Sequence, residues 1–139
     1  MTLQEKRDRL VEDLSVIEDD FERFGYIIDM GKTAQPLPDE LKLDEFLIEG
    51  CTSQLWVVPS LNEGKCYFAA DADSQITKGI AALPCDFYSG HSPEEVLEVD
   101  TGFLGEVGVT QHLSPNRRNG LSNLSKRIES FARSSVGSA

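Results

Sequence analysis

The first third of the chain carries apolar residues at a helical period. They fall 4, 3, 4 and 3 positions apart and are Leu10, Leu14, Ile17, Phe21 and Phe24. This spacing puts one apolar stripe on one face of a helix, and Gly25 predicts a break after it. Residues 26–31 continue as a short helical piece that we expect to stop at Gly31. The prolines within residues 35–39 then predict a turn.

The middle of the chain changes to short apolar runs. These runs occupy residues 46–48, 55–58 and 66–70, and they are rich in aromatic and β-branched side chains. Residues 62–64 read Asn-Glu-Gly, which is typical of the loop of a β-hairpin. The pattern therefore predicts a small antiparallel meander of about three strands.

The second half returns to a helical period. A helix capped by Asp73 or Ser74 would carry an apolar stripe down to Phe87, and Pro84 should kink or shorten it. Ser-Pro pairs at 92–93 and 114–115 predict two further helix starts. The order of helices, sheet and helices predicts one α+β domain over residues 1–139, with a flexible tail at 132–139.

Charge and cysteine content narrow the function. The chain has 13 basic and 24 acidic residues, a formal net charge of −11, which argues against nucleic acid and anionic membranes as partners. We expect no membrane span and no signal peptide, because no apolar run is long enough. Three cysteines without a CxxC pair cannot form a complete disulfide framework, so we expect a reducing, cytoplasmic location.

The three thiols differ in their surroundings. Cys66 shares a strand face with Phe68, and Cys85 lies inside the helix that contains Pro84, so both are typical of packing residues. Cys51 follows a glycine between two predicted strands, where a partner can reach a side chain. Composition and spacing alone leave Cys51 open between a reactive thiol and an inert loop cysteine. No spacing of histidines, cysteines or carboxylates predicts a metal site.

A resemblance raises the importance of Cys51. Residues 48–56 read Ile-Glu-Gly-Cys-Thr-Ser-Gln-Leu-Trp and closely resemble the G-C-x-S-Q-x-W motif of the SufE family. Four more blocks resemble family segments in the family's order, at residues 30–38, 68–80, 88–96 and 111–120. Pro84 to Asp86 depart from the usual apolar helix stretch, and Arg118 stands where a small polar residue is common. The similarity runs from about residue 8 to residue 131.

The resemblance implies a fold, a role and a set of site residues. The fold would be a small curved antiparallel sheet packed against several helices, similar to the IscU type. The role would be that of a non-enzymatic accessory protein, without cofactor or metal. It would take sulfur from a PLP-dependent cysteine desulfurase onto Cys51 as a persulfide and pass it to an iron–sulfur cluster scaffold, acting as a monomer or weak homodimer. Supporting or partner-binding positions would be Gly50, Ser53, Gln54, Trp56, Asp73, His112 and Arg117.

Alternatives remain for several of these residues. Asp73 could simply cap a helix, Arg117 could be a surface charge, and His112 could be structural. The chain could also be an iron–sulfur scaffold with Cys51, Cys66 and Cys85 as ligands. A third interpretation is a cysteine hydrolase in which His112 activates Cys51, which requires the two side chains within hydrogen-bond reach.

Overall fold

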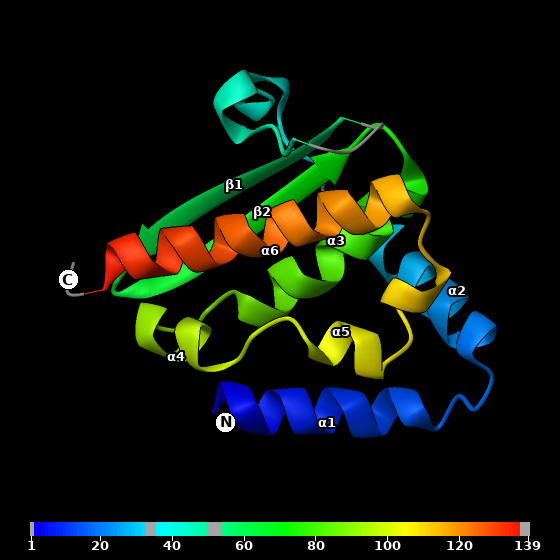
Figure 1. Cartoon of the computed structure of the whole chain (residues 1–139). Helices are drawn as coiled ribbons and strands as arrows, with labels where there is room; N and C mark the ends of the chain where they lie inside the picture. Colours follow the sequence, from blue (N-terminus) through cyan, green and yellow to red (C-terminus); the bar gives the residue numbers. More distant parts are fainter. Residues whose placement is uncertain (1, 33–35, 50–53, 137–139) are drawn as a thin grey trace.

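A β-hairpin and a long central helix organise the chain (Figure 1). The computed structural model describes residues 2–32, 36–49 and 54–136. In these residues the helices are α1 (Leu3–Ser15), α2 (Asp20–Lys32), α3 (Gln75–Tyr88), α4 (Pro93–Glu98), α5 (Phe103–Glu106) and α6 (Pro115–Ser135). The strands are β1 (Leu55–Asn62) and β2 (Lys65–Ala72), and three short 3-10 turns are η1 (Asp39–Leu41), η2 (Asp44–Phe46) and η3 (Thr110–His112).

The sheet has two antiparallel strands in the described residues, one fewer than predicted. Residues 62–65 close the hairpin, with Glu63 and Gly64 both at positive φ (53° and 77°), the backbone that suits the twist of a tight hairpin. The expected third strand at 46–48 reduces to the end of η2 and a single bridge between Leu47 and Trp56. Three residues that partly belong to a 3-10 turn are too few to continue a ladder.

The first helical region divides earlier than its apolar stripe indicated. α1 ends at Ser15 and α2 begins at Asp20, whereas Gly25 lies inside α2. The Asp19 carboxylate accepts a hydrogen bond from the Glu22 backbone N–H at 3.0 Å, a contact that caps the second helix. The sequence did not indicate the boundary between α1 and α2, because the helical spacing of apolar residues continues through the turn.

The later helices begin where the sequence predicted. The hydroxyls of Ser74, Ser92 and Ser114 accept N-cap hydrogen bonds for α3, α4 and α6. α3 continues through Pro84 to Tyr88, so the proline does not shorten it. α6 runs to Ser135, so residues 132–135 of the expected tail are helical.

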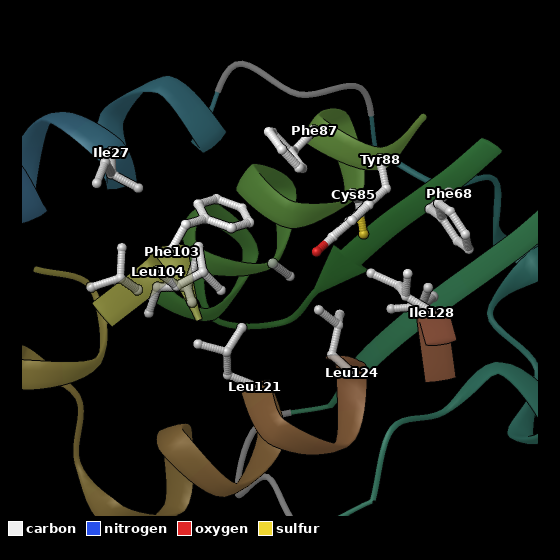
Figure 2. Packing of buried hydrophobic residues seen from close by; sticks show 14 of the residues in the cluster. Ile27, Phe68, Cys85, Phe87, Tyr88, Phe103, Leu104, Leu121, Leu124 and Ile128 are labelled. Carbon is white, nitrogen blue, oxygen red and sulfur yellow. The ribbon is translucent and has the colours of Figure 1, made fainter. Parts of the chain in front are cut away.

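The core forms where α3 meets β2, α5 and α6 (Figure 2). Phe87, Tyr88 and Phe103 stack within 4.5–6.5 Å between ring centroids. The Tyr88 hydroxyl donates to the Val99 carbonyl at 2.6 Å, so this buried polar group is satisfied. α2 crosses α3 at Gly31 and Gly79, where a Cβ on Gly31 would lie 2.3 Å from the Gly79 Cα. Within the described residues, no helix is long and apolar enough to cross a membrane.

Candidate functional site

The predicted acceptor, Cys51, lies outside the described residues, as do Gly50 and Ser53, but the chain on both sides is described. The Ile48 N–H donates to the Leu55 carbonyl at 2.7 Å, which closes the chain on itself around the undescribed residues. From α6, the Asn123 amide donates to the Glu49 carbonyl at 2.7 Å. The backbone is therefore fixed immediately before and after residues 50–53.

Asp73 holds the backbone at the start of β1. Its carboxylate accepts from the Gln54 N–H at 3.0 Å, and its own N–H donates to the Gln54 carbonyl at 3.1 Å. The N-cap of α3 is Ser74, so the helix-capping alternative for Asp73 is wrong. Gln54 itself is exposed, and Asp73 holds it through its backbone.

A buried carboxylate next to Asp73 ties a second segment to the sheet. Asp71 is only 4% exposed, and it accepts from the Leu37 N–H at 3.0 Å. It also pairs with Lys42 at 3.6 Å and Lys78 at 3.9 Å. The Lys42 ammonium lies 5.5 Å from the ring centroid of Trp56, the cross-strand partner of Asp71. Asp71 therefore anchors residues 37–42 beside the start of β1, a role that no pattern in the sequence indicated.

Arg127 is another anchor that the sequence did not reveal. Its guanidinium donates to the carbonyls of Glu45 at 3.2 Å and Leu47 at 3.3 Å. Asn123 and Arg127 are four residues apart, so they lie on the same face of α6. Their spacing was the available signal, but their acceptors are backbone carbonyls 74 to 82 residues away, which have no sequence pattern.

The first turns of α3 and α6 meet beneath Leu55. Thr77 and Arg117 line a cavity of about 10 Å³ there, roughly enough space for one water molecule. The Thr77 hydroxyl is buried and has no hydrogen-bond partner among the described residues. The Arg117 side chain is partly buried at this cavity and forms no ion pair with any described carboxylate.

His112 is directed toward α2. Its ring lies 5.8 Å from Phe21 and 5.4 Å from Phe24 between centroids. These contacts give His112 a packing role at the base of α2. Cys51 lies outside the described residues, so the hypothesis that His112 activates it stays a prediction.

The other two thiols are sealed in the core, as the sequence predicted. Cys66 and Cys85 are 0% and 2% exposed. Burial raises the pKa of both thiols, with smaller contributions from Glu94 for Cys66 and from Asp86 for Cys85. Both therefore stay protonated, which makes them poor nucleophiles. No group of three or more His, Cys, Asp or Glu in the described residues is arranged to hold a metal ion.

Comparison with known proteins confirms the resemblance found in the sequence. Residues 8–132 match the family model SufE, described as an Fe-S metabolism associated domain. The solution structure of a hypothetical protein from Thermus thermophilus is 23% identical, with a TM-score of 0.77 over 96% of this chain and 97% of that chain. At that identity the likeness supports the α+β fold alone. Because the family model spans nearly the whole chain, this protein belongs to the SufE family, and its role lies in iron–sulfur metabolism.

Proposed function

We propose that this protein accepts sulfur from a PLP-dependent cysteine desulfurase onto Cys51 and delivers it to an iron–sulfur cluster scaffold. It would act as an accessory relay rather than as an enzyme. The PLP would belong to the desulfurase, and this chain would supply the thiol and the surface that presents it.

The transfer is a thiol exchange with no net oxidation or reduction. The Cys51 thiolate attacks the outer sulfur of a persulfide on the desulfurase cysteine. A new S–S bond forms at Cys51 as the old one breaks, and the desulfurase cysteine leaves as a thiolate. A second exchange of the same kind moves the outer sulfur to a scaffold cysteine and restores Cys51.

The observation that carries the proposal is the burial of the other two thiols. Cys66 and Cys85 are sealed, and the pKa of each is raised, so neither can attack a partner's persulfide. Of the chain's three cysteines, only Cys51 combines the family motif with backbone anchors on both sides.

The anchors have a role in this scheme. Exchange requires the attacking sulfur to line up with the S–S bond. A nucleophile whose position is restricted to that geometry reacts faster than one that moves freely. Asp73 and Asn123 fix the backbone just after and just before residues 50–53. Arg117 at the start of α6 lines the cavity beneath Leu55, four residues after Cys51 in the chain, and in this scheme its charge would favour the Cys51 thiolate.

The alternatives are less well supported. A three-cysteine cluster would need Cys66 and Cys85 at a surface, yet both lie in the core with protonated thiols. A hydrolase would need His112 beside Cys51, yet the His112 ring contacts Phe21 and Phe24.

The test mixes this protein with a cysteine desulfurase and cysteine in two separate arms. Sulfide release is followed with a reductant present, and protein mass is followed without one, because a reductant removes the persulfide sulfur as sulfide. We expect faster desulfurase turnover and an added mass of about 32 Da, one sulfur atom, on the peptide that contains Cys51. Cys51→Ser should lose both effects, whereas the matched variants Cys66→Ala and Cys85→Ala should keep them wherever they fold. Full stimulation by Cys51→Ser would refute the relay.

A further inference from the structure

The corner between α1 and α2 exposes apolar side chains that no described element covers. Val16 and Phe21 are 79% and 71% exposed, the highest values among the large apolar residues described. We define the α1–α2 corner as residues 12–22. Single exposed apolar residues are common, but two on one rigid turn call for an explanation.

A buried arginine makes this corner rigid. Arg23 is only 9% exposed, and its Nε donates to the Leu14 carbonyl at 2.9 Å while its Nη2 donates to the Ile17 carbonyl at 2.6 Å. Its Nη1 pairs with Asp20 at 3.1 Å. These bonds join Arg23 of α2 to one carbonyl in the last turn of α1 and one in the turn that follows it, and so fix the angle between the two helices.

The Phe21 ring is supported from behind. The His112 ring meets it edge to face at 5.8 Å and also contacts the Phe24 ring at 5.4 Å. An aromatic side chain already held in place loses little conformational freedom when a partner covers it, which is the property of a binding anchor.

The corner is also the most acidic stretch of the chain. The sequence from residue 10 to residue 22 contains no Lys or Arg, and its acids are Glu12, Asp13, Glu18, Asp19, Asp20 and Glu22. All six are exposed, although Asp20 shares its carboxylate with Arg23. An apolar centre in an acidic rim is complementary to apolar side chains flanked by Lys or Arg.

We propose that the α1–α2 corner docks the protein that receives sulfur from Cys51, through an apolar site with a basic rim on that recipient. This inference rests on the proposed function. In Figure 1 the corner lies between the end of α1 and the start of α2, well away from the end of the hairpin where β1 begins. Because donor and recipient must use Cys51 in turn, a recipient held at the corner can wait while the donor occupies the hairpin end.

Other occupants fit the corner less well. A second copy in a symmetric dimer would bring two acidic rims together, which is repulsive. An anionic membrane is repelled by the same charge. A basic recipient protein is therefore the occupant that charge favours.

The test measures binding of the unloaded protein to the purified cluster scaffold from the same organism. The apolar variant is Val16→Ser with Phe21→Ser, and the rim variant is Glu18→Gln with Glu22→Gln. We expect each to weaken the scaffold Kd by about tenfold or more, and the wild-type Kd to rise with salt. Stimulation of the desulfurase should stay within about twofold of wild type, since the hairpin end is unchanged.

Controls come from α4. Leu97→Ser removes an exposed apolar side chain, and Glu94→Gln with Glu98→Gln removes the same charge as the rim variant, so both should leave the scaffold Kd unchanged. An unchanged Kd in both corner variants overturns the inference, and so does an equal loss of desulfurase stimulation. Failure of the proposed function would look different: no sulfur would load onto wild-type Cys51, whatever the scaffold Kd.

Discussion

Replacing Asp71 with alanine should destabilise the fold more than any change at the exposed acids around it. The carboxylate is almost fully buried and accepts from the Leu37 N–H while it pairs with Lys42 and Lys78. Removing it leaves the buried Leu37 N–H and the part-buried Ala72 N–H without this acceptor. Lys78 loses its ion pair with Asp71, and among the described residues Lys42 keeps only the pair with the exposed Asp39. The segment at residues 37–42 would lose its main tie to β2.

The magnitude follows from these contacts. A buried N–H left without an acceptor costs about 1–3 kcal/mol. The two ion pairs at 3.6 and 3.9 Å add roughly 0.5–1 kcal/mol each, because the lysines keep some access to water. The free energy of unfolding should therefore fall by about 2–5 kcal/mol. Asp71→Asn retains a carbonyl acceptor and should lose about half as much.

Urea unfolding followed by tryptophan fluorescence measures this loss. Trp56 is the single tryptophan, and it lies opposite Asp71 on β1 and beneath the Lys42 ammonium. Asp39 supplies the control, because it also pairs with Lys42, at 3.7 Å, but its side chain is 98% exposed. Asp39→Ala should change stability by less than about 0.5 kcal/mol. A loss below about 1 kcal/mol for Asp71→Ala, or equal losses for the two alanine variants, would refute the reasoning.

Three further predictions concern other parts of the chain. The thiols of Cys66 and Cys85 have pKa values raised above the ordinary 9.0, so these thiols lose their protons at lower pH in the unfolded chain than in the folded one. The free energy of unfolding should therefore fall as pH rises past about 9. The urea midpoint should show this fall, and the variant with both cysteines replaced by alanine should show less of it. Gly79→Ala would put a Cβ 2.7 Å from the Ile28 carbonyl oxygen and should cost about 1–3 kcal/mol in the same assay; wild-type stability would show that the helices can separate freely. Asp73→Ala should lower desulfurase stimulation several-fold with a stability loss below about 1 kcal/mol, and unchanged kinetics would return this residue to an ordinary surface acid.

Local capping explains which helices could be predicted from sequence. α4 and α6 begin at Ser-Pro pairs and α3 at Ser74, where a side-chain hydroxyl within the segment satisfies the first N–H groups. The boundary between α1 and α2 was not predicted although Asp19 caps α2 locally, because the apolar stripe runs through the turn. The turn itself is held by Arg23, which donates to the carbonyls of Leu14 and Ile17. An apolar stripe indicates which face of a helix is buried, but it does not indicate a side chain that hydrogen-bonds to the backbone of the preceding helix.

The site was predictable only in part, for the same reason. The motif around Cys51 is contiguous and could be recognised directly, and the sequence also indicated that Cys66 and Cys85 pack. The anchors Asn123 and Arg127 act on backbone carbonyls of residues 45–49, across more than half of the chain length. Backbone acceptors are the same at every residue, so the fold alone creates these pairs.

The two fixed residues on either side of Cys51, Ile48 and Gln54, limit how far its thiol can reach. Cys51 is three residues from Ile48 and three from Gln54, and an extended chain spans at most ~3.6 Å per residue, so its Cα must lie within ~11 Å of both. A thiol on so short a segment cannot reach deep into a partner protein. Under the proposed function, the donor would therefore have to present its persulfide at a surface that this short segment can reach. The distance to which each donor can extend its persulfide sulfur would then decide which donors this protein can serve, before any difference in chemical reactivity counts.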